Sequence, residues 1–225
     1  GDMFVVPDWG NEKGDAIEVA EKGILWLKFT VVGKQVHAST PQKGINAFRI
    51  SAELVQRLNR LYKLFGKKDR LFDPSFSTFE PTKHEKNVES VNIIPGKEVF
   101  YMDCRVLPDY NLAKVIKFAK NEAARLAKES NAQISVEVYN IEEPAKPTGK
   151  NSQLVRLLSS SIENVKGIKP KLVGIGGGTV AKYFREKGMD CAVWATLPDN
   201  AHQPNEYAVI DDMVGDSKVF AYLYI

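Results

Sequence analysis

Two residues that suit metal binding or acid–base chemistry stand directly after apolar, strand-like runs. Asp8 follows the run from Phe4 to Pro7, and His202 lies in a polar loop, residues 197–206, that follows a second apolar run. Such strand ends are where α/β proteins place their chemistry, and carboxylates and imidazoles are both zinc ligands. Each residue also has an ordinary interpretation, because a single aspartate beside a turn is common and a lone loop histidine is usually structural or solvated.

His37 stands in the segment His37–Pro41, between a predicted strand and a predicted helix. The residues alone leave open whether it packs at the helix entry or takes part in chemistry. His84 has charged neighbours on both sides and is predicted to lie on the surface.

A glycine-rich run, Gly174–Thr179, separates a short predicted strand from a helix. Its backbone N–H groups could hold a carboxylate or a phosphate, or the run could be a tight turn between closely packed elements. It lacks the Gly-Lys-Ser/Thr ending of a nucleotide P-loop and the glycine spacing of a dinucleotide site. An anion-binding turn and a purely structural turn therefore both remain open.

The elements that must position these residues form two groups. In the first, helical and alternating apolar patterns predict the order strand, helix, strand, strand, helix, strand. The predicted elements are Gly23–Val32, Asn46–Leu64, Ser75–Glu80, Val99–Val106, Leu112–Ser130 and Gln133–Tyr139. This order is that of a ferredoxin-like βαββαβ sandwich.

The second group has the pattern of α/β units and follows a polar connection with two prolines, residues 141–149. Its predicted elements are a helix at Ser152–Asn164, a short strand near Leu172, a helix at Thr179–Lys187, a strand at Asp190–Ala195 and a helix from about Asp211. We therefore predict an α/β (α+β) fold in which residues 22–141 form an inserted domain, and residues 1–21 and 142–225 belong to one other domain.

The bulk composition excludes some classes of protein. The 225 residues are 44% hydrophobic and 26% charged, with a net charge of +3 from interspersed charges of both signs. No apolar run approaches the roughly 20 residues that span a bilayer, and no basic block indicates nucleic-acid binding. Cys104 and Cys191 lie in apolar runs and are predicted to be buried and unpaired. The chain opens abruptly, without a signal-peptide pattern, and we expect it to be cut from a longer one.

Taken together, several short stretches resemble a known family, the di-zinc metallopeptidases that include aminoacylase, acetylornithine deacetylase, succinyl-diaminopimelate desuccinylase and bacterial carboxypeptidases. The resemblance extends over essentially the whole chain. Its motifs, in order, are Pro7-Asp8, Ile17–Gly23 before a long strand, His37–Pro41, Asn92–Gly96, Asp103-Cys104-Arg105, Gly177-Gly178-Thr179 and His202–Glu206.

The resemblance implies a role for each candidate residue. Asp8 corresponds to a terminal carboxylate ligand of one zinc ion and His202 to a terminal imidazole ligand of the other, with two zinc ions per subunit and cobalt or manganese as substitutes. His37 corresponds to a histidine that reaches the partner subunit's site in a homodimer and stabilises the oxyanion. The remaining positions correspond to groups that hold the substrate's carboxylate or polarised carbonyl: Asn92, Arg105, Gly177, Gly178 and Thr179.

The chain also departs from the family pattern. The family's His-x-Asp pair, bridging aspartate and Glu-Glu pair should precede Asp8 and are not in this sequence. Because two ligands cannot complete a two-metal site, we expect the chain by itself to be inactive. The family often has an aspartate just after the Gly-Gly-Thr turn, where this chain has Val180 and Ala181.

The leading hypothesis is a cytoplasmic amidohydrolase that cleaves N-acyl amino acids or small peptides. The alternative is a non-catalytic dimerisation or ligand-binding module. An RNA-binding ferredoxin-like domain is disfavoured because the central strands lack interleaved aromatic and basic residues. For the homodimer, we expect the helix Asn46–Leu64 and an edge strand near Lys28–Val32 to pair two subunits.

Overall fold

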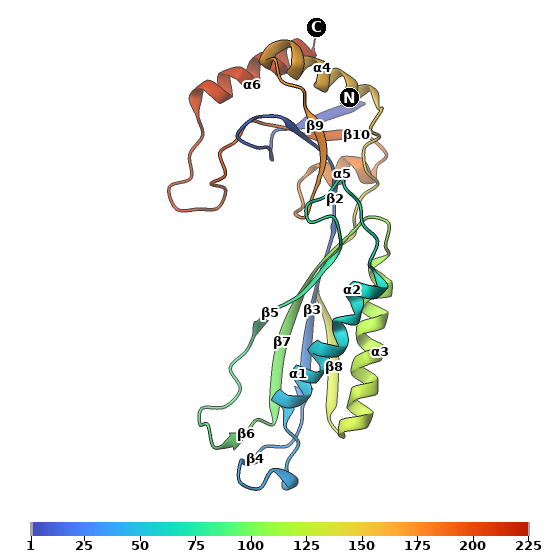
Figure 1. Ribbon diagram of the computed structural model, residues 1–225, viewed down its shortest axis with the longest axis vertical. Helices are drawn as coiled ribbons and strands as arrows, with labels where there is room; N and C mark the ends of the chain where they lie inside the picture. Colours follow the sequence, from blue (N-terminus) through green and yellow to red (C-terminus); the bar gives the residue numbers. More distant parts are fainter. Residues whose placement is uncertain (1, 225) are drawn as a thin grey trace. The chain divides into compact units, whose positions relative to one another are not determined.

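The computed structural model describes residues 2–224. The chain divides into two compact units. Figure 1 shows the ribbon coloured from the N-terminus in blue to the C-terminus in red. Unit 1 contains Gly1–Lys22, Arg70–Ser75 and Pro144–Ile225, and unit 2 contains Gly23–Asp69 and Phe76–Glu143. The short segment Arg70–Ser75 thus belongs to unit 1, although the residues before and after it in the sequence belong to unit 2. Within the described residues, no helix is long and apolar enough to cross a membrane.

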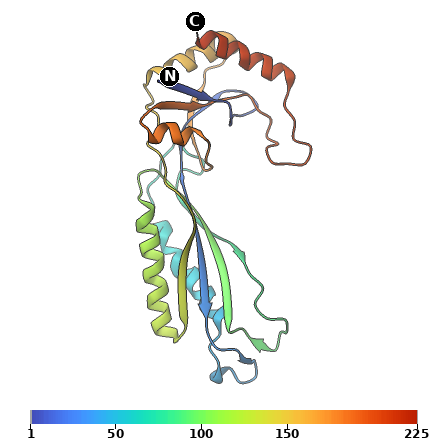
Figure 2. The ribbon, with the colours of Figure 1, turned by 180° about the vertical axis from the view of Figure 1, so that it is seen from behind.

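Unit 2 is built on a four-stranded antiparallel sheet in the order β5-β7-β3-β8. The strands are β3 (Gly23–Val32), β5 (Thr78–His84), β7 (Lys97–Val106) and β8 (Gln133–Glu142). The helices are α1 (Ala47–Leu58), α2 (Arg60–Leu64) and α3 (Leu112–Ser130), and α1 and α3 cover the same face of the sheet in both views (Figures 1 and 2). This arrangement confirms the predicted ferredoxin-like sandwich.

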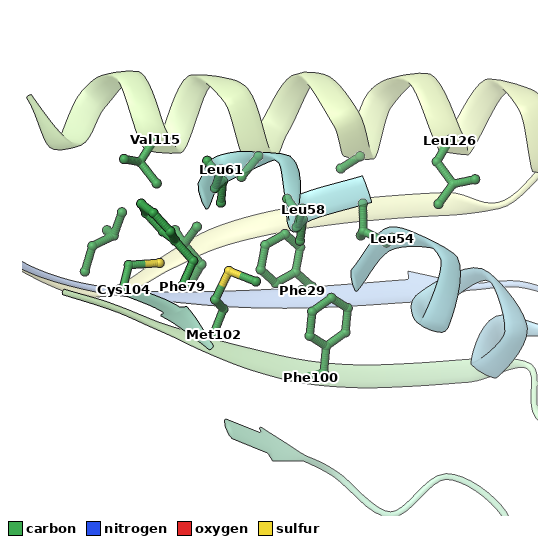
Figure 3. Close-up of a cluster of buried hydrophobic side chains, with 14 of the residues drawn as sticks. Phe29, Leu54, Leu58, Leu61, Phe79, Phe100, Met102, Cys104, Val115 and Leu126 are labelled. Carbon is green, nitrogen blue, oxygen red and sulfur yellow. The ribbon is translucent and has the colours of Figure 1, made fainter. Parts of the chain in front are cut away.

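The core of unit 2 follows from strand alternation and helix periodicity. Leu25, Leu27 and Phe29 occupy alternate positions of β3 and are fully buried beneath the helices. Helix α1 presents Leu54 and Leu58 to them, as Figure 3 shows, and the ring of Phe29 stacks on that of Phe100 from β7 at 4.6 Å. A sheet with one apolar face is therefore closed by helices with one apolar face.

Two details differ from the sequence prediction. The helix predicted at Asn46–Leu64 is interrupted at Asn59, and Leu58 and Leu61 on either side of the interruption are both fully buried. The prediction that Lys28–Val32 lies at a sheet edge is wrong, because β3 pairs with β7 and β8 along its length. The first strand of this sandwich lies between the third and fourth, so the edges are β5 and β8.

Unit 1 has a smaller sheet with helices on both faces. Its strand order is β1-β10-β2-β9, and β1 runs parallel to β10. The strands are β1 (Met3–Val6), β2 (Ala16–Glu21), β9 (Lys171–Ile175) and β10 (Asp190–Val193), and the helices are α4 (Gln153–Lys166), α5 (Ala181–Glu186) and α6 (Ile210–Leu223).

Alternation along β10 assigns the helices of unit 1 to the two faces. Ala192, together with Trp194 just beyond the strand, packs with residues of α4 and α6. Cys191 and Val193 pack instead with Ala181 of α5. Successive side chains of a strand point to opposite faces, so α4 and α6 cover one face and α5 covers the other.

Strand β2 is the longest of the strands that the sequence pattern did not predict; the others are the two-residue strands at Val36–His37 and Ile93–Ile94. All six residues of β2 are buried, including Glu18 and Glu21. A strand that buries two carboxylates does not show the usual alternation of apolar and polar residues. The reason for burying them lies in the partners described below.

Candidate functional site

His37 and Asn92, which are 55 residues apart in sequence, lie side by side in unit 2. The strand β4 (Val36–His37) pairs with β6 (Ile93–Ile94) to form a short two-stranded ribbon. The Asn92 carbonyl accepts a hydrogen bond from the Ala38 N–H at 2.8 Å, and the Asn92 amide nitrogen lies 3.4 Å from His37 Nε2. The backbone of the ribbon therefore brings together two residues that the sequence analysis selected separately.

The contacts of the His37 ring indicate its tautomer. The backbone N–H of Ser39 donates to Nδ1 at 3.2 Å, and the Ser39 hydroxyl lies 2.7 Å from the same nitrogen. Because Nδ1 accepts, the neutral ring carries its proton on Nε2; this tautomer is assigned from the hydrogen bonds. Ser90 donates to the Asn92 side-chain carbonyl at 2.6 Å, which turns the amide nitrogen toward Nε2. With the proton on Nε2, the 3.4 Å contact with the Asn92 amide nitrogen is between two N–H donors and is not a hydrogen bond, so a single oxygen atom placed between them could accept from both.

Arg105 lies elsewhere on unit 2 and does not join this pair. It stands on β7 and binds Asp103 through two hydrogen bonds, Nε to Oδ1 at 2.7 Å and Nη2 to Oδ2 at 2.9 Å. The indole N–H of Trp26 donates to the same carboxylate at 2.7 Å. Arg105 pairs with Ile24 at the start of β3, whereas the His37 ribbon follows the end of that strand, about 26 Å away at roughly 3.3 Å per residue.

Asp8 lines a cavity of about 530 Å³ in unit 1. The loop after β1 and the loop after β10 both contribute to it, because these parallel strands end side by side, with Val6 opposite Val193. His202 directly follows Ala201, the last of the lining residues, and has a positive φ of 62°. The cavity walls carry charged and amide side chains from these loops and from β9, namely Asn11, Glu12, Lys13, Asp15, Lys171 and Asp199.

The donor types at this cavity fit zinc, but their number does not complete a site. Asp8 offers a carboxylate and His202 an imidazole, which are both common ligands of Zn²⁺. Among residues 2–224, no group of three or more His, Cys, Asp or Glu side chains is placed to hold a metal ion. The Glu206 carboxylate accepts from the His202 backbone N–H at 3.0 Å, so this acid supports the loop. The chain thus presents two ligand types without a complete first coordination sphere.

The turn Gly177–Thr179 connects β9 to α5. Gly177 lines a second cavity of about 620 Å³, together with Arg70, Phe72 and Lys171 among others. Thr179 makes contacts within the protein: its N–H and its hydroxyl both donate to Glu21 Oε1, at 3.0 and 2.5 Å. The turn therefore borders a cavity through glycine while its threonine is held by a buried acid.

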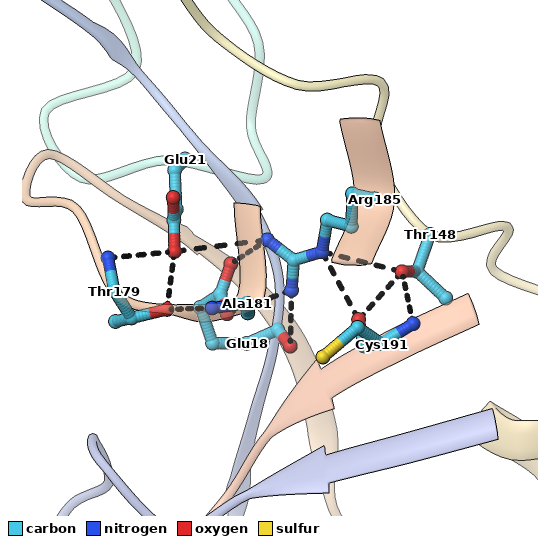
Figure 4. A network of polar contacts seen from close by, with 7 residues as sticks. All are labelled: Glu18, Glu21, Thr148, Thr179, Ala181, Arg185 and Cys191. Atoms are coloured by element: carbon cyan, nitrogen blue, oxygen red, sulfur yellow. Dashed lines mark hydrogen bonds and ion pairs between the residues drawn. The ribbon is translucent and has the colours of Figure 1, made fainter. Parts of the chain in front are cut away.

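Glu21 belongs to a buried polar network, drawn in Figure 4. The Arg185 guanidinium donates to both oxygens of Glu18 at 2.8 Å, and the side chains of Arg185 and Glu18 are only 1% and 0% exposed. Arg185 Nη1 also lies 3.9 Å from Glu21 Oε1. Burial raises the pKa of both Glu18 and Glu21, while the hydrogen bonds and charge of their partners oppose that rise.

Neither this network nor the serines that orient His37 and Asn92 could be identified from the sequence. Glu18 stands between apolar residues in the run Ala16–Ala20, which is the one signal that could have indicated a buried acid. Nothing in the sequence connects it to Arg185, 167 positions later. Ser39 and Ser90 are short polar residues in loops and carry no distinguishing pattern.

Comparisons with known proteins agree with this architecture. Residues 19–131 match the family described as a peptidase dimerisation domain. The chain is 41% identical over 235 residues to an uncharacterized metallohydrolase of Methanococcus maripaludis, covering 97% of this chain and 56% of the relative. It is 27% identical over 195 residues to a succinyl-diaminopimelate desuccinylase of Nitratiruptor, covering 86% of this chain and 50% of the relative. The chain thus spans about half the length of these curated relatives.

The fold is shared with a tripeptidase of Staphylococcus aureus. That crystal structure superimposes with a TM-score of 0.82 at 18% sequence identity, over 99% of this chain and 56% of the other. At this level of identity the likeness concerns the fold alone.

Proposed function

We propose that this chain, which belongs to the M20 family of metallohydrolases and peptidases, supplies part of an enzyme that hydrolyses the amide bond of N-acyl amino acids or small peptides. The observation that carries the proposal is the proximity of His37 Nε2 to the Asn92 amide nitrogen, which are two N–H donors in the tautomer assigned from the Ser39 contact. Amide hydrolysis places negative charge on the former carbonyl oxygen, and preorganised N–H donors stabilise that charge. The relatives named as desuccinylases support an acyl amino acid as substrate.

His37 and Asn92 have defined roles in this proposal. His37 donates from Nε2 and Asn92 donates from its side-chain nitrogen to one oxygen of the substrate. The backbone of Ser39 keeps His37 in the tautomer that can donate, and Ser90 keeps the amide nitrogen of Asn92 facing the same point. We propose that this pair serves the site of a second subunit, because the ribbon that carries it belongs to the part of the chain that matches a dimerisation domain.

Asp8 and His202 are proposed to ligate one zinc ion each, with cobalt or manganese as substitutes. A bound pair of ions would polarise the amide carbonyl and activate a water molecule. The further ligands are proposed to come from outside residues 1–225, so the chain by itself is proposed to be inactive. Arg105 and the turn Gly177–Thr179 are proposed to hold the substrate's carboxylate. The cytoplasmic location expected from the sequence stays a prediction.

The homodimer is proposed to form along β5 and α1. Strand β5 is an edge of the sheet of unit 2, and an apolar groove of about 360 Å³ lies between it and α1. Phe48 on the groove is 58% exposed, and Val55 and Phe100 line it as well. A second copy would cover these apolar side chains and satisfy the unpaired backbone of the edge strand.

Complementation between two inactive variants tests the function. In the protein that carries these residues, His37→Ala and His202→Ala should each abolish most turnover of a panel of N-acetyl and N-succinyl amino acids and dipeptides. Loss of one oxyanion donor costs roughly 10²- to 10³-fold in kcat. If His37 acts across the dimer, mixing the two variants should restore activity, because heterodimers contain one site with both residues intact.

The exposed Arg156 of α4, away from the groove and from the candidate residues, provides a control, since Arg156→Ala should leave turnover unchanged. Heterodimers that form but stay inactive would refute the role of His37 in the partner's site. A protein that dimerises and turns over no member of the panel would instead support the alternative of a non-catalytic dimerisation or ligand-binding module. Zinc titration of residues 1–225 should give weak binding, and two tight sites would contradict the proposed need for outside ligands.

A further inference from the structure

We propose that Glu21 is a positioning residue that anchors the turn Gly177–Thr179 through Thr179, so that Gly177 and Gly178 rather than Thr179 face the substrate. The inference rests on the proposed role of this turn in holding the substrate's carboxylate. It adds a residue to the site, Glu21, and separates the three residues of the turn into two roles.

The geometry shows that both donors of Thr179 are already used. Its N–H and its hydroxyl donate to the same oxygen of Glu21, at 3.0 and 2.5 Å, and its hydroxyl oxygen accepts from the N–H of Ala181 at 3.1 Å. A threonine has one backbone donor and one side-chain donor. A substrate carboxylate could therefore bind Thr179 only by displacing Glu21.

Gly177 is placed differently from Thr179. A methyl group added at Gly177 would meet no atom within 4 Å, so this position borders open space. Gly177 also lines the cavity of about 620 Å³. The turn is thus fixed at its threonine end and accessible at its glycine end, which is the arrangement expected of a backbone grip held by an internal anchor.

Glu21 is suited to anchoring because it is itself fixed. It is 4% exposed and stands on β2, a fully buried strand. The charged groups that face it are Arg185 and Lys182 of α5 and Glu18 of its own strand. Arg185 is held by Glu18 and by the Cys191 carbonyl, to which its Nε donates at 3.0 Å. The anchor therefore ties the turn to the sheet through charge-assisted hydrogen bonds, which are the stronger kind.

Amide hydrogen exchange and kinetics together test the inference. Glu21→Ala and Thr179→Val should each speed exchange at Gly177, Gly178 and Thr179 by roughly tenfold or more, because the turn loses its buried partner. Glu21→Gln should have a smaller effect, since an amide oxygen still accepts. Thr179→Ser should keep exchange slow, because serine retains both the N–H and the hydroxyl donor. For the best substrate of the panel, KM should rise about tenfold with kcat changed less than about twofold, the pattern of lost uniform binding.

The double variant Glu21→Ala/Thr179→Val should be no worse than either single variant, because both remove the same contact. Glu186→Gln, which removes an exposed acid from α5, is the charge-matched control and should change nothing. Amides of β2 and β10 should keep their exchange rates, which separates loss of the anchor from loosening of the whole unit.

Two results would overturn the inference. If Thr179→Val raised KM and Glu21→Ala did not, Thr179 would contact substrate directly. If exchange accelerated while KM stayed constant, the turn would not grip substrate. Failure of the proposed function has a different signature, namely no turnover by the wild-type protein. In that case amide exchange at the turn tests the role of Glu21 without kinetics, and unchanged exchange in Glu21→Ala would refute it.

Discussion

The two units bury charged side chains in different ways. The main buried cluster of unit 2 is apolar throughout, and the acids that this unit buries, Glu98 and Glu122, have exposed partners such as Asn87 and Arg60. Unit 1 buries an arginine between two glutamates, with Arg185 and Glu18 almost completely enclosed. An apolar core follows from residue spacing alone, whereas a buried ion network depends on partners that are distant in sequence. The two units should therefore respond differently to substitution and to pH.

The candidate site residues of the two units also differ in how firmly their partners hold them in place. In unit 2, His37 and Asn92 are brought together and oriented by backbone pairing and two serines. In unit 1, Asp8 and His202 lie exposed in loops; Asp8 lines a cavity, and His202 directly follows Ala201, which lines the same cavity. Unit 2 thus presents two candidate donors side by side, while unit 1 presents two candidate ligands without a complete metal site among the described residues. Stability and chemistry are separate properties here, and the predictions below address the first.

The largest effect is expected from Arg185→Met. Removing the guanidinium leaves two buried carboxylates without their cation, which should lower the free energy of unfolding of unit 1 by about 3–5 kcal/mol at neutral pH. The loss should shrink at acid pH as the carboxylates become protonated. Urea unfolding followed by tryptophan fluorescence measures this in a Trp26→Phe background, where the remaining tryptophans, Trp9 and Trp194, both report on unit 1.

Arg156→Met provides the matched control for this substitution. Arg156 is an exposed residue of α4 in the same unit, and its replacement should stay within about 0.5 kcal/mol of the wild type. Equal losses for the two variants would show that the buried network does not stabilise unit 1.

Leu54→Ala is the corresponding substitution in unit 2. Leu54 is fully buried in the apolar cluster, so the lost contacts and the cavity should cost about 3 kcal/mol. This loss should be the same at acid and neutral pH, because no ionisable group is involved. Hydrogen exchange of β3 and β7 amides measures it, and Leu64→Ala, at a site 53% exposed, is the control expected to have little effect. A strongly pH-dependent loss would break the comparison between the units.

The same contrast explains how much of the fold could be predicted. Strand β3 and helix α3 have the bounds that alternation and helical periodicity predict, because apolar residues dominate their buried faces, with Glu122 of α3 as an exception. Strand β2 escaped prediction because it buries Glu18 and Glu21. The edge assignment of Lys28–Val32 failed for a different reason: strand order depends on which strands pair with one another and is not visible in the residues of one strand.

Two of the candidate residues could be selected from the sequence, but the contact between them could not. His37 and Asn92 could be selected from their motifs, yet their contact depends on the pairing of β4 with β6 across 55 residues. Thr179 was expected to contact substrate, and that role stays untested, while the structure adds Glu21 as its partner. The domain boundaries proposed at residues 22 and 141 also stay predictions. Long-range partners of polar groups are what single-sequence patterns do not contain.

Gly174→Ala should have an intermediate effect. It tests the contact of Gly174 with Arg70–Ser75, the segment of unit 1 that lies in the sequence between the two segments of unit 2. A methyl group at Gly174 would lie 2.4 Å from the ring of Phe72, whose segment also accepts the Gly174 N–H at Leu71 O. Overpacking of this kind should cost about 1–3 kcal/mol of unfolding free energy in unit 1. Gly176→Ala is the matched control, since nothing lies within 4 Å of the added methyl group. Thermal unfolding of the two variants should therefore differ clearly, and identical midpoints would show that the Phe72 contact is dispensable.

The smallest expected effect is a difference between the units in the slope of stability against pH. Burial raises the pKa of Glu18 and Glu21 above the ordinary value of 4.5, so the folded unit 1 binds more protons than the unfolded chain above that pH. Their contribution is fully present below pH 4.5 and is lost as the pH rises through the raised values. In unit 2, hydrogen bonding to Arg57 lowers the pKa of Glu129, so its contribution to stability has the opposite sign and is lost as the pH falls below 4.5.

Glu21→Gln should flatten the decline in the unfolding free energy of unit 1 with rising pH and leave that of unit 2 unchanged. Urea titrations from pH 4 to 8, each unit followed by its own probes, measure both slopes, and a wild-type unit 1 whose stability rose with pH as that of unit 2 does would contradict the assignment of its buried acids.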